Sequence, residues 1–518
     1  MKKQAISLLL ALAMVVGIVL PAIPAVEAAG EHDHCVCNNN APSTIPEGNP
    51  HDCENIAYTA LTQDMVDAME PEDPDASTIY YPISGNYYLA ESVDASELLG
   101  RFRVVGDLNI CLNGNTFTCQ GFRFKTSGVT EYKVNISDCS ANATGKLVAT
   151  ANQMFFNNSN SALPATINIW GGELSGVATG TQGIIFALGS VKSGSATVHN
   201  ELNIYGGTIK GSTGDSTSSN PEGAALRLSS YTVCNMYGGV ITGGTVKANA
   251  SKNGRGGNIY MVNPETTFNM WGGLITGGQA IDEDLTDSKY AQGGNIYLSK
   301  GELNIYGGTI SGGTCSDPAN GGNIYVASNG TDAVVNFEGG KIISGQDGNT
   351  IVYQSKTLSL GITGMGLEIA ENGSIGVGYS AEITNNGFDI TTGNYGVKLY
   401  KTNGDAPEAY NPITTDKFVD GVAKYYARIT EIMAEGADTN AANATTKVHG
   451  AAYCKIGNTI VESQESAFTL KSLVKSMDAA MEEGGSLAEN TYIKTTMNEV
   501  YALYSDVMST WGLTKIGQ

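Results

Sequence analysis

The chain has 518 residues, enough for two or three domains. Its 29 basic and 51 acidic residues give a formal net charge of −22, which argues against nucleic acid and anionic membranes as partners because both are negatively charged. Only 15% of the residues are charged and 65 are glycine, a composition that favours a β-solenoid over a helical enzyme.

Residues 1–28 have the features of a secretory signal peptide. Lys2 and Lys3 precede an apolar run that ends at Leu20, and small residues follow, with cleavage expected near Ala28. Helix-breaking prolines directly after the run argue against a membrane anchor, and no later stretch is apolar enough to span a bilayer. We therefore expect an exported protein, secreted or held at the cell surface, without a membrane span after cleavage.

Residues 29–79 form a polar segment in which histidine and cysteine are concentrated. Three of the five histidines and three of the nine cysteines lie between His32 and Cys53. Imidazole and thiolate groups at such spacings bind zinc, so the candidate metal ligands are His34, Cys35, Cys37, His51 and Cys53. A disulfide-tied or flexible segment is the alternative, and export would favour it. The odd cysteine count leaves at least one thiol unpaired unless two chains pair.

A short word recurs through the middle of the chain. It reads INIWGG, LNIYGG, CNMYGG, FNMWGG, LNIYGG and VNFEGG, and its asparagines are Asn168, Asn203, Asn235, Asn269, Asn304 and Asn336. The period near 34 residues indicates a solenoid. Apolar and polar residues alternate within the word, so it predicts a short strand that ends in a Gly-rich corner.

Each repeat has room for about three such strands and no helix, which predicts a parallel β-helix whose core forms only when coils stack. We assign the apolar residues beside each asparagine to the core. The asparagines and the aromatic residues after them then share the outer face, and the candidate ligand-binding residues are Trp170, Tyr205, Tyr237, Trp271 and Tyr306. These rings either stack on sugar rings or stack on one another and stiffen the solenoid. Tyr260, Tyr297 and Tyr325 in the GGNIY units predict a further aromatic column.

The ladder extends towards the N-terminus through VNIS and LNIC, so the β-helix is expected over residues 80–400. The run HCVC…HDC, SGNYYL, LNICLNGNTF and then repeated NMYGG and GGNIY resembles exported repeat-rich β-helix surface proteins of Gram-positive gut bacteria. More broadly, residues 30–380 resemble the pectin-lyase-like superfamily of right-handed parallel β-helices. The resemblance implies that fold and specifies no activity, because one fold hosts many functions.

Insertions between repeats cluster at one corner, an edge where solenoids often bind their partners. They lie at residues 212–222, 245–255 and 279–292. In the last of these, Asp282, Glu283, Asp284 and Asp287 are either calcium ligands or a solvated acidic loop.

Beyond the repeats, a polar, proline-containing stretch at 401–416 predicts a linker. Residues 417–518 then predict a small α+β domain, with helical spacing in 467–483 and 489–510. Such a unit can cover the end coil of the solenoid, whose open edge would otherwise invite aggregation.

Enzymes of the superfamily that this chain resembles are mostly polysaccharide lyases and hydrolases. Glu201 and Glu302 align in register, but they are three coils apart, or about 14 Å, which is too far for a glycosidase acid pair. The coils offer mainly Arg227 and Lys341 as basic residues for a lyase. We therefore expect a non-catalytic adhesin or scaffold that binds a polysaccharide or a host or bacterial surface protein. A polysaccharide lyase or glycoside hydrolase is the alternative.

Overall fold

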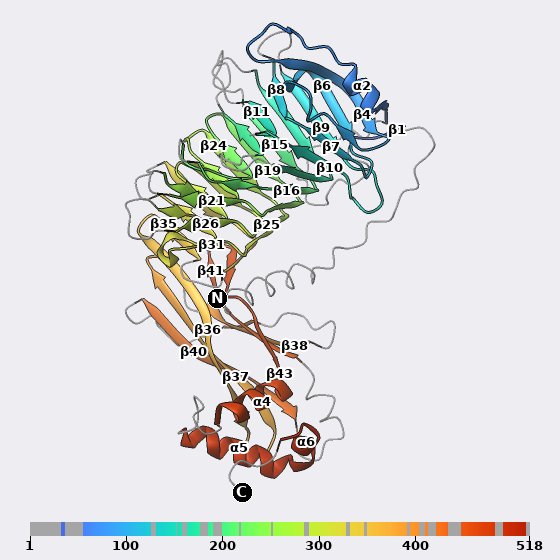
Figure 1. Ribbon diagram of the computed structural model, residues 1–518. Coiled ribbons are helices and arrows are strands. Elements are labelled where there is room, and N and C mark those ends of the chain that lie inside the picture. Colours follow the sequence, from blue (N-terminus) through green and yellow to red (C-terminus); the bar gives the residue numbers. More distant parts are fainter. Residues whose placement is uncertain are drawn as a thin grey trace.

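The computed structural model describes most of the chain after residue 54. The described ranges are 33–36, 55–125, 131–151, 153–157, 163–176, 185–189, 199–216, 219–249, 252–283, 290–327, 332–345, 350–390, 394–402, 410–412, 421–433, 447–481 and 490–513. The predicted signal segment lies outside them, as do Cys37, His51, Cys53, Asp284, Asp287 and most of the expected linker. The described chain is mainly β, and Figure 1 shows a long stack of strands that leads into a C-terminal unit with helices.

The strands that carry the recurring asparagines form the first of three parallel ladders. They are β4 (Tyr80–Leu89), β6 (Arg101–Cys111), β9 (Tyr132–Ser137), β12 (Ala165–Ile169), β15 (Asn200–Ile204), β19 (Thr232–Met236), β24 (Thr266–Met270), β29 (Gly301–Ile305) and β33 (Ala333–Phe337). Asparagine stands opposite asparagine throughout the described pairings. The repeat predicted from the sequence is therefore confirmed as a structural unit.

The second ladder follows the corner after the first, which is Gly-Gly in the six coils from β13 to β34. It contains β5 (Val93–Asp94), β7 (Thr116–Cys119), β10 (Lys146–Ala149), β13 (Glu173–Gly176), β16 (Thr208–Lys210), β20 (Val240–Thr242), β25 (Leu274–Thr276), β30 (Thr309–Ser311), β34 (Lys341–Ile343) and β42 (Thr459–Glu462). At this corner Gly207 has φ +74°, and a Cβ atom there would lie 2.6 Å from the Gly172 carbonyl oxygen of the preceding coil. Only glycine fits so close an approach.

The third ladder completes each coil. Its strands are β8 (Phe122–Phe124), β11 (Phe155–Asn157), β14 (Phe186–Leu188), β18 (Leu226–Leu228), β23 (Ile259–Met261), β28 (Ile296–Leu298), β32 (Ile324–Val326) and β35 (Ile351–Tyr353). Between residues 167 and 345 the described helical structure is one 3-10 turn, Pro318–Asn320. These long parallel sheets have the strand organisation of a β-solenoid.

Smaller parallel sheets lie at the corner where the repeats carry insertions. One joins β17 (Thr213–Gly214), β21 (Thr245–Ala248), β26 (Gln279–Asp282) and β31 (Thr314–Cys315). The other pairs β22 (Gly254–Arg255) with β27 (Ala291–Gln292). The insertions of successive coils are therefore brought side by side on one edge of the stack.

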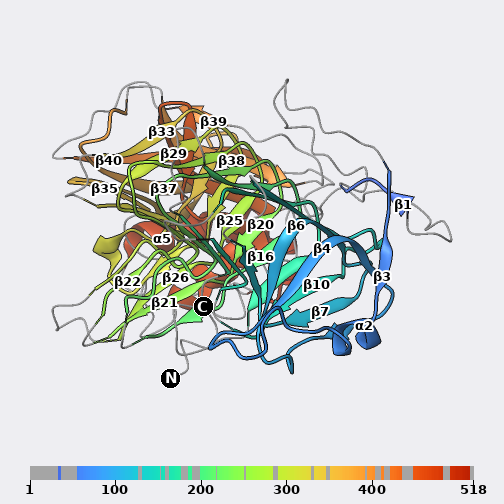
Figure 2. The same cartoon turned by 90° about the horizontal axis from the view of Figure 1, so that it is seen from above.

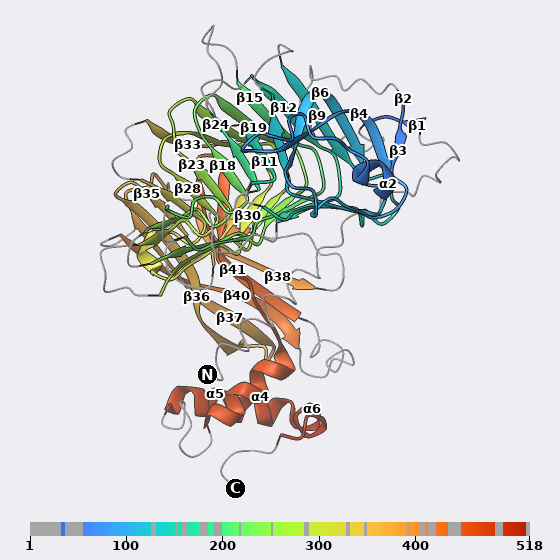
Figure 3. The ribbon, with the colours of Figure 1, turned by 45° about the horizontal axis from the view of Figure 1, so that its top comes forward.

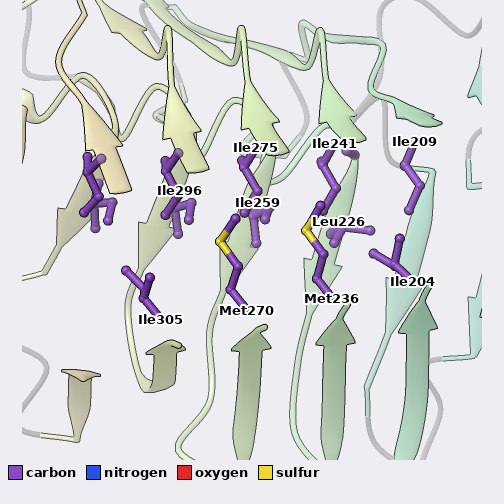
Figure 4. Close-up of a cluster of buried hydrophobic side chains, with 14 of the residues drawn as sticks. Ile204, Ile209, Leu226, Met236, Ile241, Ile259, Met270, Ile275, Ile296 and Ile305 are labelled. Atoms are coloured by element: carbon purple, nitrogen blue, oxygen red, sulfur yellow. The ribbon is translucent and has the colours of Figure 1, made fainter. Parts of the chain in front are cut away.

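Apolar columns from all three ladders meet in the interior (Figure 4). The first ladder contributes Ile204, Met236, Met270 and Ile305, and the second and third contribute residues such as Ile241 and Ile259. All of these side chains are fully buried. The predicted inward assignment of the residues beside each asparagine is confirmed, and each coil buries its apolar face against its two neighbours.

The recurring asparagines themselves form an outer ladder. Each Nδ2 donates to the Oδ1 of the asparagine one coil earlier, over 2.6–3.0 Å, along the series Asn336, Asn304, Asn269, Asn235, Asn203, Asn168, Asn135, Asn109 and Asn86. A primary amide both donates and accepts, so one residue type can continue the chain of bonds from coil to coil.

A second, inner ladder was not predicted. The asparagines of the GGNIY-type corners, Asn258, Asn295 and Asn323, are fully buried. The Nδ2 of Asn295 donates to the Ser311 carbonyl and to Asn323 Oδ1, each over 2.8 Å. Its Oδ1 accepts from the Gly278 backbone N–H over 2.9 Å and from Asn258 Nδ2 over 2.8 Å. This buried amide makes four bonds, which offsets the cost of removing it from water.

Short elements precede the first coils. The strand β1 (Asp33–His34) pairs antiparallel with β2 (Ile56–Ala57), and β3 (Thr59–Leu61) pairs in parallel with β4. The one-turn helix α2 (Gln63–Asp67) starts at Thr62, whose hydroxyl accepts from the Met65 backbone N–H. Figures 2 and 3 show α2 beside β3 at the N-terminal end of the stack.

Parallel pairing in the third ladder ends at β35, earlier in the chain than the expected bound of residue 400. The next strands pair antiparallel: β36 (Lys356–Ile369), β37 (Ile375–Asn386), β38 (Tyr395–Thr402), β39 (Tyr410–Pro412), β40 (Val422–Met433), β41 (Lys447–Ile456) and β43 (Ser466–Thr469). Strand alternation is the same for parallel and antiparallel partners, so the sequence pattern did not reveal the change.

Three helices follow these strands and complete the C-terminal unit (Figure 3). They are α4 (Leu470–Met481), α5 (Thr491–Leu503) and α6 (Ser505–Thr510). Both helices predicted from spacing are therefore present, and buried Leu470, Leu473 and Val474 on α4 pack into the hydrophobic core.

The C-terminal unit is joined to the parallel stack by β42, which adds to the second ladder beside β34. Glu462 on β42 accepts ion pairs from Lys341 Nζ at 3.3 Å and Lys398 Nζ at 3.7 Å. The side chains of Glu462 and Lys398 are only 5% and 4% exposed. This buried cluster ties the last coil to the strands that follow it.

We expect Asn295→Ala to lower the free energy of unfolding by about 3 kcal/mol or more, because it leaves buried donors and acceptors without partners. The matched control is Asn336→Ala at the end of the outer ladder, where one ladder bond is lost and the expected cost is about 1 kcal/mol. Urea denaturation of both variants measures the difference. Equal costs would contradict a special role for the inner ladder.

We expect Glu462→Gln to lower the stability of the C-terminal unit by about 3–5 kcal/mol, because a buried charge cluster loses its carboxylate. Glu382→Gln is the control, since its partner Lys424 is 74% exposed and the expected cost is below about 1 kcal/mol. Denaturation followed by Trp511 fluorescence, in a background where Trp170 and Trp271 are replaced by phenylalanine, reports on this unit. Unchanged midpoints in both variants would contradict the coupling.

Candidate functional site

The aromatic residues predicted for ligand binding follow the outer asparagines and stack on one another. Ring centroids are 3.8 Å apart for Trp170 and Tyr205, 5.0 Å for Tyr205 and Tyr237, and 4.0 Å for Trp271 and Tyr306, with planes within 12° of parallel. Trp170, Tyr205 and Tyr237 are less than 9% exposed, whereas Tyr306 is 38% exposed. The stacking interpretation thus has direct structural support, and sugar binding by these rings stays a prediction.

The aromatic column is interrupted in two early coils. In the strand register Tyr88 stands opposite Cys111, and Cys111 stands opposite Ser137, one coil before Trp170. Two small side chains therefore occupy positions where later coils place a ring. Tyr58, from the segment before β3, lies there and forms a side-chain hydrogen bond with Ser137.

The N-terminal segment around β1 packs at this interruption. His34 stacks on Tyr58 with centroids 4.6 Å apart, and Cys35 is buried in a cluster that includes Trp170 and Tyr205. Of the predicted metal ligands, His34 and Cys35 are described, and Cys37, His51 and Cys53 lie outside the described residues. Among the residues that the structure describes, the one group of three metal-binding side chains close together is His34, Cys111 and Cys139.

Cys111 and Cys139 were not predicted as members of this cluster. Their Sγ atoms are 3.2 Å apart, and Cys139 Sγ also lies 3.3 Å from Asn113 Oδ1. The hydrogen bond to Cys111, together with burial, raises the pKa of the Cys139 thiol. The sequence held one signal: Cys111 ends the word LNIC, where five of the seven later words end in tyrosine or tryptophan.

A second column runs along the outer face of the third ladder. From the N-terminal end its register reads Arg103, Arg123, Phe156, Ala187, Arg227, Tyr260, Tyr297 and Tyr325. The predicted tyrosine column is present, with ring centroids 5.6 Å and 5.3 Å apart. At about 4.8 Å per coil, the column is roughly 34 Å long. We call this set of residues the arginine–tyrosine face.

Arginine is rare in this chain and is concentrated here. The sequence contains six arginines, and Arg101, Arg103, Arg123, Arg227 and Arg255 lie on or beside this face. The sixth, Arg428, lies on β40 in the C-terminal unit. Arg103 packs over the Tyr80 ring at 3.6 Å, and Arg123 over the Phe156 ring at 4.7 Å. Arginine presents a planar fork of donors that suits carboxylate and sulfate groups.

The three insertions predicted as a binding edge supply side chains to this face. Glu222 comes from 212–222 and Arg255 from 245–255, while Tyr290 and Gln292 come from 279–292. Glu222 accepts from Arg227 Nε at 3.4 Å and from Arg255 Nη1 at 3.2 Å. Side chains that are far apart in the sequence therefore converge on a single cluster.

The electrostatics of the cluster keep Arg255 charged. Burial alone would lower the pKa of Arg255, but Tyr260, Tyr297 and Glu222 together raise it. Burial also raises the pKa of Tyr260 to about 12, so its phenol stays protonated and able to donate a hydrogen bond at neutral pH. The buried Nε of Arg255 has no hydrogen-bond acceptor among the described residues. The cluster thus combines a fixed positive charge with neutral phenols.

The acidic residues considered for catalysis and for calcium binding form hydrogen bonds or ion pairs within the protein, or are buried. Glu201 and Glu302 accept hydrogen bonds from Asn235 and Asn336 of the following coil, at 3.3 Å and 3.1 Å. In the predicted calcium loop, Asp282 is buried and Glu283 accepts from Lys247 Nζ at 3.4 Å. Calcium binding stays a prediction.

In comparisons with known proteins, no family model matches the chain, and no curated protein or solved structure is significantly similar to it. Among the described residues, no helix is long and apolar enough to cross a membrane.

We expect Tyr205→Ala to lower the free energy of unfolding by about 3 kcal/mol, because it removes a buried ring that stacks on both neighbours. Tyr306→Ala should cost about 1 kcal/mol or less, because Tyr306 is partly exposed and stacks on one ring. Thermal denaturation measures both changes. A stable Tyr205→Ala variant would show that the column does not support the fold.

Proposed function

We propose that this chain is an exported, non-catalytic right-handed parallel β-helix that binds an extended acidic polysaccharide along the arginine–tyrosine face. The observation that carries the proposal is the concentration of five of the six arginines on or beside that face, with Arg103, Arg123 and Arg227 in the same register column as the stacked tyrosines. Export rests on the signal-like N-terminus, and a role as a cell-surface adhesin follows from it.

The charge of this face differs from that of the whole chain. At the N-terminal end Glu72 forms ion pairs with Arg103 and Lys125, and Arg101 and Arg123 lie beside Arg103 on β6 and β8. At the other end a single carboxylate, Glu222, lies between two guanidinium groups. The face therefore keeps excess positive charge on a protein of net charge −22, and an acidic chain would be attracted there and repelled elsewhere.

The shape of the face favours a polymer over a small molecule. A parallel stack repeats its side chains once per coil, so an extended chain meets similar groups at regular intervals. Tyr260 and Tyr297 are only 3% and 6% exposed, so their rings stack within the face and support Arg255, while the arginines donate to acidic substituents. Many weak contacts give high affinity only when they are linked in one ligand, so monosaccharides should bind weakly.

Binding is tested on a panel of acidic and neutral polysaccharides, with the wild-type chain and two arginine variants. Arg255→Gln should weaken binding to an acidic polymer at least tenfold, whereas Arg428→Gln, the arginine outside the face, should leave it unchanged. Added salt should weaken wild-type binding, because the contacts are charged. Thermal denaturation of both variants serves as the control that they remain folded.

Two results would overturn the proposal. Equal binding by Arg255→Gln and wild type would show that this face is not the binding site. A preference for neutral polymers would show that the ligand is not acidic. The same incubations are assayed for released sugars and for new unsaturated ends. Either product would establish a hydrolase or lyase in place of a non-catalytic binder.

A further inference from the structure

We propose that His34, Cys111 and Cys139 bind a zinc ion that fastens the N-terminal segment to the outer face of the first coils. This site differs from the one expected from the sequence, because two of its three ligands come from the parallel stack. It is also distinct from the arginine–tyrosine face, whose residues from Arg123 to Tyr325 lie on the third ladder.

The orientation of the imidazole suits metal binding. His34 Nδ1 lies 2.7 Å from the Cys35 carbonyl oxygen, which can only accept, so Nδ1 carries the proton. Nε2 of the neutral ring then holds the lone pair that a metal requires, and a backbone carbonyl on the other ring nitrogen is a common way of fixing a histidine ligand. The stack on Tyr58 holds the plane of the ring.

The distances between the three side chains suit a tetrahedral ion. One ligand atom from each of His34, Cys111 and Cys139 lies within 4.8 Å of the other two. Zn–S bonds of about 2.3 Å and Zn–N bonds of about 2.0 Å place tetrahedral ligand atoms roughly 3.5–3.8 Å apart. The Sγ–Sγ distance of 3.2 Å needs only a small increase, and it exceeds the roughly 2.05 Å of a disulfide bond.

The site lies where the outer aromatic column is interrupted. Cys111 and Ser137 leave the space that rings fill in later coils, and the segment with His34 and Tyr58 occupies it. Cys111 is at the end of β6 and Cys139 follows β9, so the ion would join two adjacent coils to β1. Soft thiolates with one imidazole favour zinc over the hard cations calcium and magnesium. Three protein ligands leave the fourth tetrahedral position to a further ligand.

The test measures metal content and metal-dependent stability of the full chain, purified with a thiol reductant. We expect about one zinc per wild-type chain, and a melting temperature that falls by several degrees when a chelator removes it. Cys139→Ser should reduce bound zinc at least tenfold and should make the melting temperature insensitive to the chelator. Cys234→Ser is the control: it removes a thiol that is buried elsewhere in the stack and should keep the zinc.

Cobalt substitution adds a readout that is independent of stability. Co²⁺ should give a thiolate-to-metal charge-transfer band in wild type and in Cys234→Ser, and a much weaker band in Cys139→Ser. The proposal is overturned if wild type holds neither metal, or if Cys139→Ser holds zinc as well as wild type does. It is also overturned if chains alkylated without a reductant contain Cys111 and Cys139 joined in a disulfide.

Discussion

The parallel register of the coils is the constraint on which the rest of this structure depends. Every described coil places asparagine opposite asparagine, and the amide side chains bond from one coil to the next. A slip of one residue would bring asparagines into the core and isoleucines out of it, so the apolar columns and the amide ladder specify the same register. The inner ladder through Asn295 adds a buried amide that holds the corners in the same alignment.

The same register brings functional groups together. Because one position per coil recurs in a column, a change of residue in one coil creates a local feature on an otherwise uniform face. Cys111 and Ser137 replace rings and make room for the N-terminal segment. Arg227 begins a run in which the next three coils carry tyrosine. Insertions at a single corner then add Glu222 and Arg255 to that run without disturbing the strands.

The ends of the stack are protected in different ways. At the C-terminal end, β42 extends the second ladder, and β36 pairs antiparallel with β35, the last strand of the third. Both strands belong to a unit with its own sheet and helices, so the last strands of the second and third ladders are paired rather than open. At the N-terminal end, β3 pairs with β4, and β1 and β2 lie beside them.

The sequence alone determined the repeat, its strands and the face to which each side chain of the asparagine word points. These properties are local, since alternation along a strand and glycine at a corner depend on neighbouring residues only. It also predicted the tyrosine column and the corner that gathers the insertions. The antiparallel partners after Tyr353 were not predictable, because strand alternation does not identify a partner. Asn295 points into the core because the corner before it changes which residues face inward. Alternation along a strand does not show such a change. The meeting of His34 with Cys111 and Cys139, and of Glu222 with Arg227 and Arg255, was decided only by the tertiary structure, because folding brings together residues whose positions in the sequence carry no record of that contact.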